Sequence, residues 1–375
     1  MRVLHIYSGN LYGGIETMLT TLARHRAVCP EMESHFALSF EGRLSEELRA
    51  AGANVHQLGN VRASRPASVL RARRALAELL RENDFDVAVC HAPWSQAVFG
   101  KTVRACDVPL VFWQHDAAGG HHWLERWARR TPPDLAICNS RFTASTLSNL
   151  YPQTRAEVIY CPVTLTETYY SNDERAATRD ELETPAKATV IIQVSRIEKW
   201  KGHALHLEAL SRLTDLPDWM CWLVGGAQRP QEAAYYEELK QAAARLGIKE
   251  RVRFVGERAD IARLLHAADI FCQPNRSPEP FGIALIEALH AGLPVVTTAL
   301  GGAREIVDDS CGVLVEPANA EALAEALREL IVNHGRRSDL GSRGAARALQ
   351  LCDAATQLQS LRSALMSVSR LELVG

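Results

Sequence analysis

Short apolar runs alternate with longer stretches of helical periodicity along most of this chain of 375 residues. The first half holds runs typical of buried strands at 3–7, 35–38, 87–90, 110–114, 135–138 and 158–160. Between them, stretches such as 17–26 and 68–80 repeat apolar residues at the spacing of an amphipathic helix. This alternation predicts βαβ units around a parallel sheet.

The pattern is interrupted once, by the polar, charge-rich residues 166–188, which we interpret as a linker with a short helix. Strand-like runs then resume at 190–194, 219–224, 253–255, 270–273, 295–297 and 312–315, and a helical region extends from 320 to about 368. We therefore expect two doubly wound α/β domains, residues 1–165 and 189–354, with a C-terminal helix at 355–375 packing back on the first. Ligands of such sheets bind beyond the carboxyl ends of the strands, so a cleft between facing domains is the expected site.

Composition narrows the class of protein. A formal net charge of -2 argues against nucleic acid as the main partner, because phosphate backbones require a basic face. The nine cysteines are scattered without a CxxC pair, which favours reduced, buried thiols. The N-terminus is too polar for a signal peptide and no apolar stretch is long enough to span a membrane. We expect a cytoplasmic protein, peripheral to a membrane at most.

Two cations follow the first strand of the second half, in the segment "QVSRIEKWKGH". Arg196 and Lys201 stand between a strand and a helix, where a guanidinium fork, an ammonium and helix N–H groups together bind a diphosphate. The alternative is a pair of solvated surface cations.

Paired glycines follow the first strand of the chain, in "GNLYGGIETML". Gly13 and Gly14 would let the backbone approach a ligand closely. An ordinary strand-to-helix turn is the alternative, and the spacing is not that of a dinucleotide fingerprint.

Two carboxylates flank a predicted helix start in "SPEPFGIALIEALHAG". N–H groups of Phe281, Gly282 and Ile283 would bind an anionic oxygen at that start. Glu279 could accept hydrogen bonds from ligand hydroxyls, and Glu287 could take both hydroxyls of a ribose. Alternatively, these acids stabilise the helix N-terminus, by about 0.3–1 kcal/mol.

Histidines end two strands of the first half: His91 in "DVAVCHAPWS" and His115 in "LVFWQHDAAGG". Carboxyl ends of strands are where sites form, although a structural role is the alternative for each. Asp84 and Asp86 match a two-aspartate metal-binding motif. Because they directly precede a strand, we interpret them as solvated residues at the start of that strand. No other metal ligand set is evident.

Taken together, these pieces resemble the retaining glycosyltransferases of family four, which have the two-domain GT-B fold. The resemblance covers nearly the whole chain, and its strongest piece reads "SPEPFGIALIEALHAGLPVVTTALGGAREIV". Further pieces are "VSRIEKWKG", "WLVGG", "VRFVGER", "LLHAADIFCQPN", "QHD" and "CNSRFT". The family often has a proline directly before the glutamate of "GGAREIV", and this chain has Arg304 there instead. Arg304 is either an extra contact to the phosphate or the acceptor, or a surface residue at the start of a helix.

The resemblance implies roles for the acidic and basic residues of the second half. Arg196 and Lys201 would neutralise the donor diphosphate, and Glu287 would bind the ribose. Glu279 would contact hydroxyls of the transferred sugar, helped by the N–H groups at 281–283.

For the remaining candidates the resemblance implies contacts around the same donor. Gly13 and Gly14 would approach the phosphates, and His115 would lie near the C6 side of the sugar at the reacting centre. The stretch 255–258, with Gly256 and Arg258, would contact the nucleobase.

The implied reaction moves a sugar from a nucleoside diphosphate sugar to a glycan or lipid-linked acceptor, forming an α-glycosidic bond with retention. A UDP-sugar is the first choice of donor and GDP-mannose the second, with no cofactor and no metal. The alternatives are another GT-B enzyme, such as a sugar-nucleotide epimerase or a phosphorylase, and an inactive sugar-binding homologue.

The acceptor is expected on the N-terminal half. Residues 1–165 hold 18 Lys and Arg against 15 Asp and Glu, and the excess gathers in "VRASRPASVLRARRALAELLR" and "LERWARR". A basic amphipathic helix of this kind binds anionic lipid, which would place the protein at the inner membrane face. A solvated helix face is the alternative.

Overall fold

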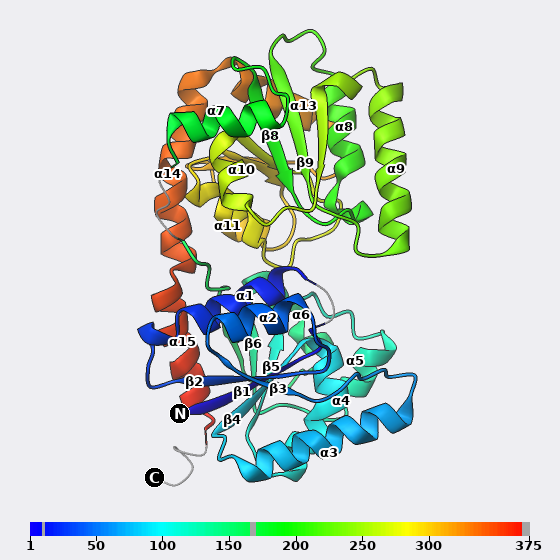
Figure 1. The fold of residues 1–375 in the computed structure, drawn as a ribbon, viewed down its shortest axis with the longest axis vertical. Coiled ribbons are helices and arrows are strands. Elements are labelled where there is room, and N and C mark those ends of the chain that lie inside the picture. The colour runs from blue at the N-terminus through cyan, green and yellow to red at the C-terminus, as the bar shows by residue number, and fades with distance from the viewer. Residues whose placement is uncertain (10–11, 166–169, 370–375) are drawn as a thin grey trace. The chain divides into compact units, whose positions relative to one another are not determined.

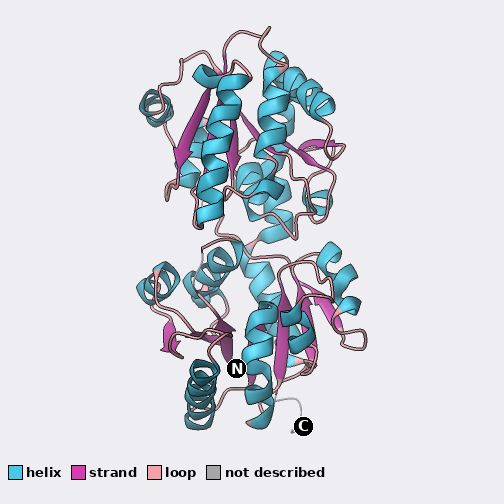
Figure 2. Ribbon diagram, turned by 90° about the vertical axis from the view of Figure 1, so that its right-hand side faces the viewer, coloured by secondary structure: helices cyan, strands magenta, loops and turns pink. Residues whose placement is uncertain are grey.

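The computed structural model describes residues 1–9, 12–165 and 170–369. It divides into two compact units, one made of Met1–Thr164 with Cys352–Gly375 and the other of Leu165–Leu351. Each unit has a parallel sheet at its centre with helices on both faces (Figures 1 and 2). The predicted α/β class with two doubly wound sheets is confirmed.

The sheet of the first unit has the strand order β3-β2-β1-β4-β5-β6-β7 within the described residues. Every residue of β4, β5 and β6 is buried, as expected for strands covered on both faces. The bounds are β1 Arg2–Tyr7, β2 Glu33–Leu38, β3 Asn54–Gln57, β4 Val87–His91, β5 Leu110–Gln114, β6 Leu135–Cys138 and β7 Ala156–Val158.

The helices of the first unit cover both faces of this sheet. On one face α3 and α4 bury a cluster with Leu4, Ile6 and Cys90, while on the other side α1 contacts α2 and α15. The bounds are α1 Gly14–Arg24, α2 Arg43–Ala50, α3 Pro66–Glu82, α4 Ala92–Ala105, α5 Trp123–Ala128, α6 Arg141–Thr146 and α15 Ala354–Met366, with short 3-10 turns at Arg26–Val28 and Leu147–Asn149.

Two strands of this sheet differ from the sequence prediction. β3 (Asn54–Gln57) was not anticipated, because the edge strand "NVHQ" is polar and only partly buried and so lacks the apolar run of a central strand. The last strand was predicted at 158–160 but ends at Val158, with Ala156 already paired to Ala136.

The sheet of the second unit has the order β10-β9-β8-β11-β12-β13 within the described residues. Alternate residues of its strands pack with α8, α9 and α13 in one core that includes Ile191, Leu223 and Cys272. The strand bounds are β8 Thr189–Val194, β9 Trp219–Val224, β10 Val252–Gly256, β11 Ile270–Gln273, β12 Val295–Thr298 and β13 Gly312–Val315.

The helical region predicted from 320 to about 368 is not continuous. Helix α13 ends at Val332 and α14 at Cys352, and the side chain of Asp353 caps α15 by accepting a hydrogen bond from Thr356 N at 2.8 Å. The helices of the second unit are α7 Asn172–Glu181, α8 His203–Ser211, α9 Pro230–Arg245, α10 Ile261–Ala267, α11 Ile283–His290, α12 Ala303–Ile306, α13 Ala320–Val332 and α14 His334–Cys352, with 3-10 turns at Lys199–Lys201 and Lys249–Arg251.

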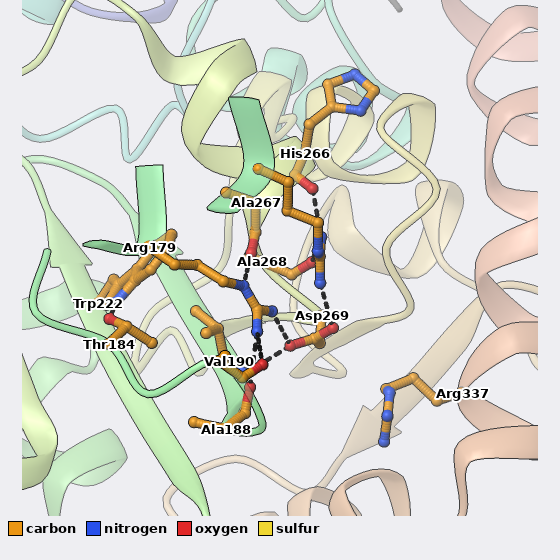
Figure 3. A network of polar contacts seen from close by, with 12 residues as sticks. Arg179, Thr184, Ala188, Val190, Trp222, His266, Ala267, Ala268, Asp269 and Arg337 are labelled. Carbon is orange, nitrogen blue, oxygen red and sulfur yellow. Dashed lines mark hydrogen bonds and ion pairs between the residues drawn. The ribbon is translucent and has the colours of Figure 1, made fainter. Parts of the chain in front are cut away.

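The segment interpreted as a linker, 166–188, belongs largely to the second unit. Residues 166–169 lie outside the described part, but α7 packs on α10. Arg179 of α7 pairs with Asp269 at 2.7 Å (Figure 3). Arg175 of the same helix pairs with Asp269 at 2.7 Å as well. The carboxylate of Asp269 also accepts the backbone N–H of Val190 at 2.7 Å, so it joins α7 to the start of β8. This network explains why a charge-rich helix is held on the sheet.

No disulfide joins any of the nine cysteines, and all of them except the half-buried Cys106 are buried, which agrees with the expectation of core thiols. Among the described helices, none is both long and apolar enough to cross a bilayer.

Candidate functional site

Strand order reverses between β8 and β11 in the second unit, and residues from both strands meet beyond their carboxyl ends. Arg196 and Lys201 follow β8, while Asn275 and Glu279 follow β11, which is hydrogen-bonded to β8. Such a switch point is where doubly wound sheets bind ligands, since the two flanking loops diverge there.

Lys201 and Glu279 form a buried ion pair at this point. Nζ of Lys201 donates to Oε2 of Glu279 at 2.8 Å, and the two side chains are only 14% and 8% exposed. Nε2 of Gln273 and Nδ2 of Asn275 donate to the same oxygen at 3.1 and 2.6 Å. The carboxylate is therefore fixed by three donors on one oxygen.

The sequence motifs assign Lys201 and Glu279 to different parts of a donor and do not indicate that the two residues pair. The motifs give no role to Gln273 or Asn275 either. The sequence contains a signal for these two residues, because they are polar side chains at the end of the buried run "IFCQPN". Burying a polar side chain costs free energy unless it forms a hydrogen bond with a neighbour.

Arg196 is also paired with acidic side chains. Its guanidinium lies 3.0 Å from Glu198 and 4.0 Å from Glu232, and the indole of Trp200 donates to Glu198 at 2.9 Å. Arg196 is partly exposed, so its fork can reorient toward an anion that arrives at the switch point.

Glycines allow the two loops to approach. Gly202, with φ 76°, ends the turn that carries Lys201, and a Cβ there would lie 1.8 Å from the carbonyl oxygen of Pro274. Gly301, with φ 62°, bridges to Glu279, whose carbonyl accepts the N–H of Gly302 at 2.7 Å. The backbone on both sides of the ion pair is thereby fixed by sites that only glycine fits.

Helix α11 begins at Ile283, two residues later than the sequence motif predicts. Gly282, in a left-handed conformation with φ 116°, caps the helix, and buried Phe281 precedes it. Glycine adopts that conformation without strain, and the N–H groups of the helix itself begin with that of Ile283.

Glu287 lies one turn further along α11. Its carboxylate has no hydrogen bond or ion pair with any residue that the structure describes, and burial raises its pKa to about 7. A half-buried carboxylate without a partner is poised to accept hydrogen bonds from ligand hydroxyls.

The candidate nucleobase stretch is at the end of β10. Gly256, with φ 78°, accepts the N–H of Gly225 at 2.8 Å. The guanidinium of Arg258 is bound by Asp260 at 2.7 Å and by Glu181 at 2.6 Å, and these hydrogen bonds raise its pKa. Its side chain therefore braces α7 against α10, and any base contact would come from the backbone of this stretch.

The other candidates lie in the first unit. Gly13 caps α1 and Gly14 begins it, next to the buried Glu16, which accepts a hydrogen bond from Tyr7 at 2.7 Å. His115 is buried, and burial lowers its pKa to about 3, so the ring is neutral near pH 7. Nε2 of His115 lies 3.0 Å from Nδ1 of His91.

Among the described residues, no group of three or more His, Cys, Asp or Glu side chains has the arrangement of a metal site. Asp86 accepts the N–H of Arg2 at 2.6 Å, in keeping with its interpretation as a strand entry.

Comparison with known proteins agrees with this architecture. The sequence model of the family "Glycosyl transferases group 1" matches residues 174–347, and the sequence model of "Glycosyltransferase Family 4" matches residues 12–167. The chain is 30% identical to the D-inositol 3-phosphate glycosyltransferase of Kineococcus radiotolerans over 71% of its own length and 68% of that protein. It is also 30% identical to the lipopolysaccharide core biosynthesis glycosyltransferase LpsE of Rhizobium meliloti, over 56% of this chain and 58% of that one.

Among solved structures, Anabaena HepE in complex with UDP-glucose is similar, with a TM-score of 0.87, 27% identity and coverage of 98% of this chain and 100% of that one. Two parallel-sheet units of this kind define the GT-B architecture. The chain belongs to the group 1 glycosyltransferases, as the sequence resemblance implied.

Proposed function

We propose that this glycosyltransferase moves a sugar from a nucleoside diphosphate sugar to a glycan or lipid-linked acceptor, with retention, in an α-linkage and without a metal. The buried pair of Lys201 and Glu279 at the switch point of the second unit is the observation that carries the proposal. A UDP-sugar is favoured as donor because the similar HepE was solved with UDP-glucose, and GDP-mannose is the second choice.

Charge develops on the β-phosphate as the bond to the sugar breaks. Arg196 and Lys201 supply two cations beside that position, and the first N–H groups of α11 add a partial positive charge. These groups together can stabilise the leaving diphosphate, the role that a divalent ion has in other transferases.

The ion pair also orients the groups that would bind the sugar. Three donors hold one oxygen of Glu279, so its other oxygen can accept from a hydroxyl of the sugar. Glu287, without a partner among the described residues, would accept the two ribose hydroxyls, and these hydrogen bonds favour its ionised form.

In the first unit, we propose that His115 contacts the C6 side of the sugar and that Gly13 and Gly14 approach the phosphates. Backbone groups at Gly256 and Arg258 would contact the base. These roles rest on the family resemblance and on the position of each residue at the carboxyl end of a strand.

The acceptor surface of the first unit carries exposed apolar and basic side chains. Leu70 on α3 and Trp123 on α5 are 55% and 50% exposed, with exposed arginines at 71 and 74 on α3, at 126 on α5 and at 130 just after α5. Such a mixture favours the interface of an anionic bilayer, so we place the enzyme in the cytoplasm and peripherally at the inner membrane face.

Thermal shift against a panel of nucleotide sugars tests the donor, since a bound donor raises the melting temperature by mass action. Transfer with the selected donor is then followed in excess EDTA, and the anomeric configuration of the product is read by NMR. Retained activity in EDTA and an α-linked product are expected. A strict requirement for Mn²⁺, an inverted product or epimerised donor without transfer would contradict the proposal.

A further inference from the structure

Three histidines lie side by side on neighbouring strands of the first sheet. His5 belongs to β1, His91 ends β4 and His115 directly follows β5, and β4 pairs with both β1 and β5. Nδ1 of His5 lies 3.0 Å from Nε2 of His91, and Nδ1 of His91 lies 3.0 Å from Nε2 of His115. His5 and His91 are fully buried and His115 is 5% exposed.

The register of the strands directs this row toward the carboxyl edge of the sheet. His5 is paired with Val89, two residues before His91, and His91 is paired with Trp113, two residues before His115. Side chains two residues apart share one face of a strand, so each step moves one strand sideways and two residues toward the edge. The row therefore connects the middle of β1 with the candidate residue His115.

The hydrogen bonds couple the protonation of the three rings. A neutral imidazole has one N–H and one bare nitrogen, and each bond joins Nδ1 of one ring to Nε2 of the next. Only two arrangements satisfy both bonds: every ring carries its proton on Nδ1, or every ring carries it on Nε2. Burial lowers the pKa of His5 and His115 to about 3 and that of His91 further, so neutral rings are expected near pH 7.

The inner end of the row distinguishes these arrangements. Nε2 of His5 is buried and has no hydrogen-bond partner among the described residues. With protons on Nε2 throughout, this atom would be an orphaned buried N–H, which is rarer in proteins than an unsatisfied acceptor. The arrangement with every proton on Nδ1 is favoured. The absence of a described partner there also gives a proton no onward path, so a proton relay is not supported.

The outer end of the row, at His115, has a different environment from the inner end at His5. Nδ1 of His115 has no hydrogen bond to any described residue, yet it is not among the fully buried polar atoms without a partner, so part of this atom stays exposed in a side chain that is 5% exposed. The ring of Trp113 stacks on His91 and His115 at centroid distances of 5.3 and 5.6 Å, which restricts rotation of both imidazoles.

We propose that His91, supported by His5, is a positioning residue that holds His115 as a neutral Nδ1–H donor aimed outward for an oxygen of the substrate. The identity of that oxygen as part of the transferred sugar rests on the proposed function. The tautomer of His115 does not rest on the proposed function, because it follows from the three rings alone.

The tautomer is read directly by long-range ¹⁵N–¹H NMR of the full chain labelled at histidine nitrogens, with the His115 signals assigned by their loss in His115→Asn. We expect Nδ1 of His115 to be protonated and Nε2 to be bare. A His115 protonated on Nε2 would overturn the proposal, whether or not any sugar donor has been found.

A matched pair of variants tests the positioning. The amide of His91→Asn lies as many bonds from Cα as Nδ1 and can still bond His115, whereas the amide of His91→Gln reaches the Nε2 side and bonds only His5. With the selected donor, we expect kcat to fall about tenfold in His91→Gln and less than about threefold in His91→Asn. Equal losses in the two variants would show a merely structural role. If wild type transfers no sugar, the proposed function fails while the NMR result still decides the tautomer.

Discussion

Replacing Lys201 by alanine removes the cation from the buried pair at the switch point of the second unit. Glu279, which is only 8% exposed beside this lysine, keeps the amides of Gln273 and Asn275 as its remaining donors. Breaking a buried ion pair costs about 3–5 kcal/mol when the other charge is left alone. Because two amide donors stay, we expect a smaller loss of unfolding free energy, about 2–3 kcal/mol.

The loss of activity should be much larger than the loss of stability. Removing one preorganised group that stabilises developing charge lowers kcat by about 10²–10³-fold. The loss in unfolding free energy corresponds to a melting temperature lower by about 4–12 °C, so Lys201→Ala should remain folded at 25 °C.

The assay combines urea unfolding with initial rates of transfer on the same preparations. Lys199→Ala is the matched control, because Lys199 belongs to the same 3-10 turn, is 75% exposed and lies 3.8 Å from the exposed Glu238. It should change the unfolding free energy by less than about 0.5 kcal/mol and leave the rate unchanged. Normal turnover in Lys201→Ala would refute the diphosphate role, and unchanged stability would refute the buried pair.

Three further predictions concern the second unit. Burial raises the pKa of Glu287 from 4.5 to about 7, so this group destabilises the fold as the pH rises through that interval. Glu287→Gln should therefore unfold at a higher urea concentration than wild type at pH 8, and at the same concentration as wild type at pH 4.5. The variant should also lose donor affinity in a thermal-shift titration. Gly202→Ala, whose Cβ would meet the carbonyl of Pro274, should lower the unfolding free energy by about 3 kcal/mol, and equal stability would contradict the close approach. Asp269→Asn should cost about 3 kcal/mol by urea unfolding, because Arg179 loses its buried charge partner, and a cost below about 1 kcal/mol would show that the network is incidental.

Much of the fold could be predicted from local pattern. Strands β5, β9 and β11 have the predicted bounds, since short runs of apolar residues buried on both faces contrast sharply with their polar flanks. The polar edge strand β3 and the docking of α7 could not be predicted, because a partner distant in sequence decides both.

The candidate site was predicted as a set of residues but not as a set of contacts. Motif spacing indicated Arg196, Lys201, Glu279 and Glu287, whereas nothing local indicated that Lys201 would pair with Glu279. His5 was missed for the same reason, because one polar residue in the apolar run "VLHIY" shows its purpose only beside His91.

Hydrophobic periodicity and glycine placement are local properties, so the α/β class, the order of the elements and the residue types that follow each strand could be predicted from the sequence. Which of those residues meet depends on the tertiary fold. Parallel strands that are neighbours in the sheet are far apart in the chain, so the order β8-β11 and the stagger of β1, β4 and β5 set the ion pair and the row of imidazoles. Such contacts depend on sheet order and register, which a local pattern does not contain.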